Sequence, residues 1–140
     1  MLDKPYLQKK MDLLSESIGK LERLVDGDIE EIKRDELKLP ALERHFQKAV
    51  DAMVDINTHI LKEGNFGTVD DLQGTFKMLG TAHVLEEKFA VKVAPIVGSR
   101  NMLVHGYEKL DKDMFLNNLK RNFSDFKNYM IQINGYLNKS

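Results

Sequence analysis

The amino-acid sequence predicts an all-α fold, an up-and-down antiparallel bundle of four main helices with one or two short helices. Three long segments carry apolar residues at alternating spacings of three and four, which is the period of one face of an α-helix. No segment alternates apolar and polar residues between hairpin turns, so strands are hard to place. The connections between helical segments are short, and short connections favour antiparallel neighbours in a bundle.

The first helix is predicted to begin near Pro5, because the first turn of a helix does not need the N–H that proline lacks. Its apolar face consists of Leu7, Met11, Leu14, Ile18, Leu21 and Val25. Gly27 interrupts the pattern. Asp28 is then predicted to cap a short second helix that carries Ile29 and Ile32, since an aspartate accepts hydrogen bonds from free N–H groups at a helix start.

A second long helix is predicted to open at Pro40 and to end before the Gly-Asn-Phe-Gly segment at residues 64–67. Its apolar face consists of Leu42, Phe46, Ala49, Met53, Ile56 and Ile60. The next helix is predicted to be short, to start with a capping box formed by Thr68 and Asp71, and to close at Gly80.

Another helix is predicted to run from near Val84 to Pro95, which should kink or end it because proline removes a backbone donor. Asp111 is predicted to cap the last long helix. The apolar face of that helix consists of Leu116, Leu119, Phe123, Phe126, Met130, Ile133 and Leu137.

Length and composition predict one domain over residues 1–140. The absence of cysteine excludes disulfides and thiol catalysis, and we expect a cytoplasmic protein with no signal peptide and no membrane partner. A formal net charge of −1 argues against broad electrostatic adhesion to nucleic acid, and no DNA partner is expected. Residues 88–127 nevertheless hold eight Lys or Arg and four acidic residues, a balance of +4, which suits a phosphate-bearing ligand.

Residues 100–107 concentrate the potential chemistry of the chain in Arg100, Asn101, His105 and Tyr107. A guanidinium binds a phosphate through two N–H groups at once, and an imidazole takes and gives protons near neutral pH. On one continuous helix, Arg100 and Tyr107 would share a face, whereas Arg100 and His105 would lie about 140° apart. A convergent site therefore requires long side chains or a second copy of the chain.

Each of these residues also has an ordinary structural explanation. Arg100 could pair with a carboxylate near a helix end, and His105 could be a hydrogen-bonded residue at the edge of the core. Tyr107 could be an amphipathic residue at one end of the bundle. Asn101 lies one helical turn before His105 and could orient the imidazole, hold a phosphate oxygen or cap a helix. The clustering of all four residues favours the functional explanation.

The pattern R-N-x-x-x-H-x-Y, placed before a long amphipathic helix, resembles the signature of the HEPN superfamily and, within it, the HepT toxin family. The resemblance extends over roughly residues 40–137. It implies a ribonuclease toxin that cleaves RNA without metal or cofactor through Arg100 and His105. It also implies a homodimer whose two motifs face each other across a cleft.

The same resemblance implies that Tyr107 accepts AMP from an MntA-type nucleotidyltransferase antitoxin, which would silence the toxin. An alternative from a different class is a non-catalytic subunit that binds substrate or nucleotide for a minimal nucleotidyltransferase. A purely structural bundle would leave the motif unexplained.

A polar strip borders the apolar face of the second long helix. Asp55 and His59 stand four residues apart there, as do Asp51 and Asp55, so a structural Asp55–His59 pair is expected and a role in lining the cleft remains open. His45 and His83 have no motif around them and are assigned structural roles. No His, Asp or Glu pattern with standard metal spacing occurs elsewhere in the sequence.

Overall fold

The helical pattern of the sequence appears in the structure as a series of helices, the longest connection between them being residues 64–71. The computed structural model describes residues 1–139, which contain no strand, so the predicted all-α class is confirmed. The elements are α1 (Lys4–Val25), α2 (Ile29–Arg34), α3 (Lys38–Glu63), α4 (Leu72–Thr81), α5 (Glu87–Val93), α6 (Ile96–His105), the 3-10 turn η1 (Tyr107–Lys109), α7 (Lys112–Arg121) and α8 (Ser124–Lys139).

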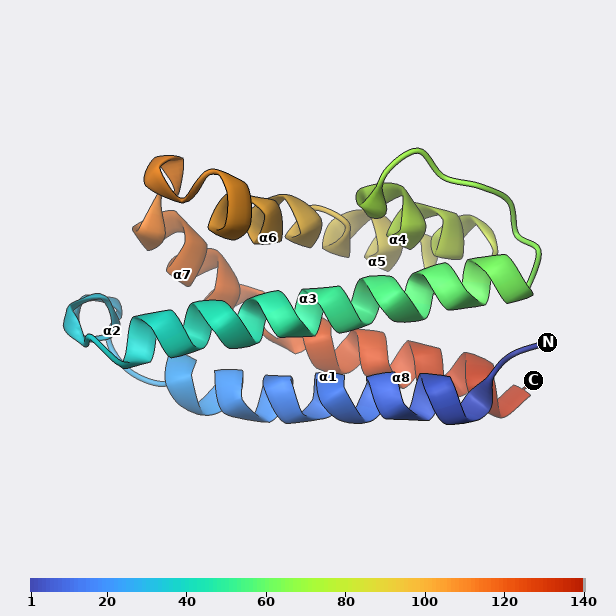
Figure 1. Ribbon diagram of the computed structural model, residues 1–140, viewed down its shortest axis with the longest axis horizontal. Coiled ribbons are helices and arrows are strands. Elements are labelled where there is room, and N and C mark those ends of the chain that lie inside the picture. Colours follow the sequence, from blue (N-terminus) through green and yellow to red (C-terminus); the bar gives the residue numbers. More distant parts are fainter. Residues whose placement is uncertain (140) are drawn as a thin grey trace.

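The two longest helices, α1 and α3, lie side by side in opposite directions (Figure 1). All six residues of each predicted apolar face are buried, because each helix turns that face toward the interior. Asp3 caps α1 through a hydrogen bond from the Tyr6 N–H to Oδ1 at 3.0 Å. Burial of these two apolar faces is the main source of stability for the pair.

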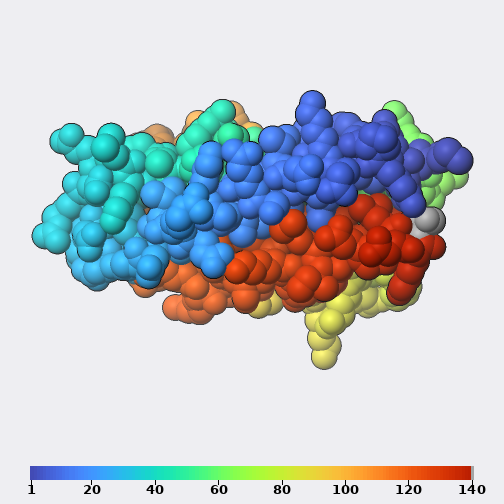
Figure 2. Space-filling view, turned by 90° about the horizontal axis from the view of Figure 1, so that it is seen from below, coloured from blue at the N-terminus to red at the C-terminus, as the bar shows by residue number. Residues whose placement is uncertain are grey.

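The remaining sides of the bundle are formed by α8 and by a series of short helices. α8 lies beside α1 on the face shown in Figure 2. α4, α5 and α6 lie along the side of α3 that is turned away from α1 (Figure 1). The prediction of an all-α bundle is therefore confirmed, but the described residues contain more short helices than the one or two predicted.

A small polar network joins three helices inside this core. The hydroxyl of Tyr129 on α8 donates to Oδ1 of Asn57 on α3 at 2.6 Å and to the Met53 carbonyl at 3.1 Å. Asn57 in turn donates from Nδ2 to Oγ1 of Thr75 on α4 at 3.2 Å. Because buried polar groups are costly unless paired, these contacts specify how α4 and α8 dock on α3.

Several predicted helix starts differ from the structure. The side chain of Asp28 makes no capping hydrogen bond, although α2 does follow it. α3 starts at Lys38, two residues before Pro40, because Oδ1 of Asp35 accepts the N–H groups of Leu37 and Lys38 at 2.8 and 3.0 Å. A capping carboxylate upstream of the proline therefore determines where this helix begins.

The short helices depart from prediction in the same way. The Gly74 N–H donates to Oδ1 of Asp71 at 2.7 Å, so Asp71 caps α4 and Thr68 lies outside it. α5 begins at Glu87, later than Val84, and ends before Pro95 as predicted. The proline then stands at the N-cap of α6, where its missing N–H leaves no acceptor unsatisfied within that helix.

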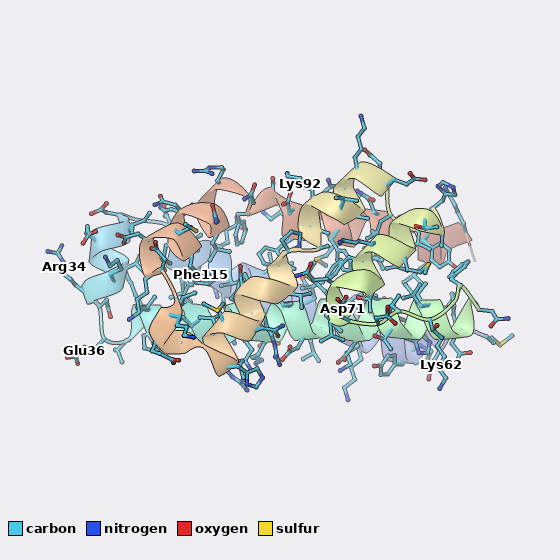
Figure 3. All side chains as sticks on the ribbon, turned by 90° about the horizontal axis from the view of Figure 1, so that it is seen from above. Arg34, Glu36, Lys62, Asp71, Lys92 and Phe115 are labelled. Carbon is cyan, nitrogen blue, oxygen red and sulfur yellow. The ribbon has the colours of Figure 1, made fainter. Side chains whose placement is uncertain are left out.

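The last predicted helix is divided into α7 and α8 by a turn at residues 122–123. Asp111 caps α7 as predicted, through a hydrogen bond from the Met114 N–H at 3.0 Å. The division lets α7 lie near one end of the bundle while α8 runs beside α1 (Figures 1 and 2). Arg34 and Glu36 mark that end in Figure 3, and Lys62 lies at the opposite end.

None of the helices in the described residues combines the length and the apolar character that a membrane crossing requires.

Candidate functional site

Three residues of the R-N-x-x-x-H-x-Y motif lie on α6, and the fourth lies beyond its end. α6 ends at His105, and the Gly106 N–H closes the last turn by donating to the Met102 carbonyl at 3.1 Å. Tyr107 then begins the 3-10 turn η1. The expectation that Arg100 and Tyr107 share one helix face is therefore wrong, because the helix does not continue through the phenol.

Arg100 is held against α3 by a carboxylate. Its Nε donates to Oδ1 of Asp51 at 2.8 Å, and its Nη1 lies 3.4 Å from Oδ1 of Asn101. The Arg100 side chain is 22% exposed and that of Asp51 is 45% exposed. The ion pair uses the Nε edge of the guanidinium, so the outer edge, with Nη2, stays available for a phosphate oxygen.

His105 has the opposite environment. It is exposed, and its ring forms no hydrogen bond or ion pair with any other residue between 1 and 139. It follows Arg100 by five residues on α6, which corresponds to a rise of roughly 7.5 Å and a rotation of about 140°. Within one chain the two side chains thus point to different sides of the helix, as the spacing predicted.

A row of polar residues at spacings of four runs along α3, and we call it the α3 polar row. It consists of Glu43, Gln47, Asp51, Asp55 and His59. A step of four residues exceeds one full turn by about 40°, so the row winds gradually around the helix. Its early members accordingly face η1 and α6, and its later members face α1.

The later members of the row do not form the expected pair. Oδ2 of Asp55 accepts from Nζ of Lys10 on α1 at 2.7 Å, and that hydrogen bond raises the pKa of Lys10. Nε2 of His59 accepts from the backbone N–H of Asp3 at 3.0 Å. The predicted Asp55–His59 pair is thus replaced by two contacts with the start of α1.

Asp55 and His59 nevertheless line the same surface groove as the motif arginine. Arg100, Asp51, Asp55, His59 and Lys62 are among the residues around this groove, which lies between α1, α3 and the α4–α6 side. His105 and Tyr107 are not part of its lining. One copy of the chain therefore offers a partial site, in which Arg100 lines the groove and His105 lies outside the groove.

Tyr107 is joined to the first member of the α3 polar row. Its hydroxyl donates to the carboxylate of Glu43, with Oη 2.9 Å from Oε2 and 3.2 Å from Oε1. Nζ of Lys112 lies 5.0 Å from the centre of the phenol ring. Partial burial raises the pKa of Glu43, while the Tyr107 hydrogen bond and the Lys112 charge oppose that shift.

Sequence reasoning did not find Glu43. The signal that could have found it is its spacing, since it stands eight residues before Asp51 in the same row. Eight residues along α3 correspond to about 12 Å. The contact of Tyr107 with Glu43 and the contact of Arg100 with Asp51 are therefore about 12 Å apart along this helix. The phenol and the guanidinium of one chain are thus separated by more than two helical turns.

A second pocket, partly open to solvent, is lined by residues of α3, α5, α7 and α8 and by the start of α6. Its walls include Phe46, Phe115, Phe126 and an ion pair in which Nζ of Lys92 lies 2.9 Å from Oδ1 of Asp125. Lys92 and Phe115 are labelled in Figure 3. None of the four motif residues lines this pocket, so it is separate from the candidate site.

Metal-binding side chains are dispersed in this fold: no group of three or more His, Asp or Glu is placed to hold a metal ion within residues 1–139. His83 lies at the surface with a φ of 61°, and its Nδ1 is 3.8 Å from Glu87. His45 is partly buried, and burial lowers its pKa. The structural roles assigned to His45 and His83 stay predictions.

The helical bundle and its motif together define a class of protein. An all-α chain that carries arginine and histidine five residues apart at the exposed end of a helix, followed by a capping turn and a long amphipathic segment, has the features of a HEPN ribonuclease.

Comparison with known proteins identifies the family within that class. The family model described as "Ribonuclease HepT-like" matches residues 14–133. The chain is 34% identical over 95 residues to the tRNA nuclease HepT of Aphanizomenon flos-aquae, a match that covers 68% of this chain and 65% of that protein. It is 22% identical over 125 residues to the mRNA nuclease HepT of Shewanella oneidensis, with 85% and 94% covered.

The fold agrees with the same family. A solved structure of the tri-AMPylated HEPN toxin of Shewanella oneidensis in complex with MNT antitoxin matches with a TM-score of 0.84 at 22% identity, covering 96% of this chain and 99% of that one. The chain belongs to the HepT-like ribonuclease family. The predicted family and enzyme class are thereby confirmed.

Proposed function

We propose that this chain is the ribonuclease toxin of a HepT–MntA-type toxin–antitoxin pair and that it cleaves cytoplasmic RNA without a metal ion. The observation that carries the proposal is the contrast between two residues of α6. Arg100 is held in place by Asp51 with Nη2 available, and His105 is exposed with both ring nitrogens unengaged in the described structure. An anchored cation and a free imidazole are the two groups that this cleavage requires.

The chemistry is an internal transesterification of RNA. The ribose 2′-hydroxyl attacks the adjacent phosphorus and loses its proton to a base, and the 5′-oxygen leaves with a proton from an acid. His105 fits either proton-transfer role because its ordinary pKa lies near neutrality. Arg100 fits the phosphate, whose negative charge grows in the transition state.

A second copy of the chain would complete the site. The base and the acid act on opposite sides of the phosphorus, so one histidine cannot serve both in a single step. The separation of Arg100 and His105 around α6 also supports a site shared between two motifs. We therefore propose a homodimer in which the two α6 helices face each other across the RNA.

We propose further that Tyr107 is the residue modified with AMP by an MntA-type partner. The Shewanella structure, which is that of a tri-AMPylated HEPN toxin in complex with MNT antitoxin, supports regulation of this chain by AMP transfer. Tyr107 is 38% exposed, so its phenol is within reach of a partner enzyme. A nucleotide added there would place bulk and negative charge beside His105 at the entrance to the shared site.

One experiment tests the nuclease. Purified chain is incubated with total cellular RNA in excess chelator, beside an Arg100→Ala, His105→Ala double variant. Cleavage by the wild type alone supports the proposal. Equal products from both proteins would assign the activity to a contaminant, and intact RNA in both samples would favour a non-catalytic subunit that binds substrate or nucleotide for a nucleotidyltransferase.

A further inference from the structure

Tyr107 and Glu43 form a contact that RNA cleavage does not use. We propose that Glu43 is the general base for AMP transfer to Tyr107, so that the toxin itself supplies the group that activates its modified residue. This inference rests on the proposed function, because it takes Tyr107 as the acceptor of AMP.

The geometry directs the phenol proton at the carboxylate. Oη of Tyr107 lies 2.9 and 3.2 Å from the two oxygens of Glu43, so the hydroxyl hydrogen points toward α3. The lone pair opposite the hydroxyl hydrogen then points away from the Glu43 carboxylate, and Tyr107 as a whole residue is 38% exposed. A nucleotide can thus approach the Tyr107 oxygen from the side opposite the Glu43 carboxylate, which accepts the proton.

The chemistry requires such a base. A phenol with an ordinary pKa of about 10 is almost entirely protonated at neutral pH and is a weak nucleophile. Glu43 is half-buried, and partial burial raises its pKa, which makes its carboxylate a stronger proton acceptor than an exposed glutamate. Lys112 lies on the ring face of the same phenol, where its charge suits an approaching phosphate.

The step balances with ATP as the co-reactant. A bond forms between Oη of Tyr107 and the α-phosphorus of ATP, and the bond from that phosphorus to the oxygen bridging the β-phosphate breaks. Pyrophosphate leaves with the electron pair of the broken bond. The phenol proton passes to the Glu43 carboxylate and from there to solvent.

Two other tyrosines show what distinguishes Tyr107. Tyr129 is fully buried, and its hydroxyl donates to an amide oxygen and a carbonyl, neither of which is a useful base. Tyr6 is 36% exposed, close to the 38% of Tyr107, but its ring packs against His59 with the ring centres 5.0 Å apart. Exposure together with a carboxylate on the hydroxyl therefore singles out Tyr107 among these three.

The test measures the rate of AMP incorporation in single turnovers, with saturating ATP and the cognate MntA-type nucleotidyltransferase. Glu43→Gln keeps the shape and a hydrogen-bond acceptor but cannot take the proton, so we expect the rate to fall about 10²-fold. Glu43→Asp retains a carboxylate on a shorter arm and should recover at least tenfold over the Gln variant. Glu108→Gln is the matched control, because it removes the neighbouring exposed charge in η1 and should leave the rate unchanged.

The outcomes separate this inference from the proposed function. If wild-type Tyr107 takes up no AMP, the modification proposal fails and the role of Glu43 fails with it. If the wild type is modified and Glu43→Gln is modified at the same saturated rate, only the role of Glu43 is overturned. The same conclusion follows if Glu43→Gln folds normally by circular dichroism and takes up AMP as fast as Glu43→Asp. Glu43 would then only support Tyr107 through a hydrogen bond, and its role as general base would be overturned.

Discussion

Nε of Arg100 on α6 lies 2.8 Å from Oδ1 of Asp51 on α3, and this contact orients the arginine of the motif. The pair fixes one edge of a side chain that has many rotamers, and it leaves the outer edge toward the groove. A catalytic arginine gains from this arrangement because orientation before the reaction lowers the entropic barrier. Asp51 is therefore expected to act on catalysis through Arg100.

The Asp51–Arg100 pair gives a first prediction. Asp51→Ala should lower the rate of RNA cleavage by about 10- to 100-fold, since small displacements of a catalytic group are costly. The stability of the fold should change little, because partly exposed ion pairs contribute roughly 0–1 kcal/mol. Initial cleavage rates and thermal unfolding measure the two effects.

Asp55→Ala is the matched control for this change. It removes the next carboxylate of the α3 polar row, whose partner is Lys10 and not the motif. A similar loss of cleavage in both variants would show that the groove needs negative charge in general. No loss in Asp51→Ala would mean that Arg100 orients itself without α3.

A second prediction concerns the two motif residues directly. His105→Ala should lower cleavage in chelator by about 10²-fold or more, the loss expected when general acid–base catalysis is removed. Arg100→Lys should also lower the rate of RNA cleavage substantially, because lysine keeps the charge but cannot bind a phosphate through two parallel N–H groups. The product should carry a 2′,3′-cyclic phosphate, which mass spectrometry of a short RNA identifies.

His83→Asn provides the control for loss of an exposed histidine. His83 is remote from α6 in sequence and adopts a φ of 61°, a conformation that asparagine tolerates. Wild-type cleavage by this variant is expected. Wild-type cleavage by Arg100→Lys would instead contradict the proposed contact with phosphate.

A third prediction is that the chain forms a symmetric dimer. One chain turns Arg100 and His105 to different sides of α6, so a composite site requires two copies. Sedimentation or light scattering at micromolar concentration should give twice the mass of the 16.1 kDa chain. A stable monomer that RNA does not alter would remove the shared site and favour a binding subunit.

The fold was largely predictable because helical spacing encodes burial. Every residue of the apolar faces predicted for α1 and α3 is buried, since a repeat of three and four places those side chains on one side of a helix. Helix ends were less predictable, because a cap depends on the orientation of one side chain. Asp35, which caps α3, precedes Pro40 by five residues and carries no helical periodicity of its own.

The candidate site was predictable only where it is local in sequence. The separation of Arg100 and His105 follows from their spacing on one helix. The partners Asp51 and Glu43 come from a different helix, so their contacts depend on how α3 packs against α6 and η1. The roles of the motif residues stay predictions.

A fourth prediction uses the pH dependence of stability. Burial, with smaller contributions from Lys20 and Lys48, lowers the pKa of His45 below its usual range. A group with a lowered folded-state pKa contributes stability that is present above its unfolded pKa of about 6.5 and is lost as pH falls. His45→Gln should therefore lose less stability than the wild type between about pH 7 and pH 5, as measured by thermal unfolding at each pH. If the stability of the wild type and of His45→Gln falls by the same amount over this pH range, groups other than His45 cause the loss at acid pH.

The last prediction concerns the packing that positions α5, the helix that leads through Pro95 into α6. A Cβ added to Gly80 on α4 would lie 2.7 Å from Cβ of Ala90 on α5, which is closer than packed atoms allow. Gly80→Ala should thus lower the free energy of unfolding by about 1–2 kcal/mol, the overpacking penalty exceeding the gain in helix propensity. Gly135→Ala on α8, where the added Cβ would meet no atom within 4 Å beyond its chain neighbours and its own helix backbone, should instead raise the free energy of unfolding by about 0.5–1 kcal/mol. Urea unfolding of both variants measures the two changes in the free energy of unfolding. If both substitutions stabilise the chain, α4 and α5 can move apart at little cost. The contact between Gly80 and Ala90 would then not be what positions α5 and, after it, α6.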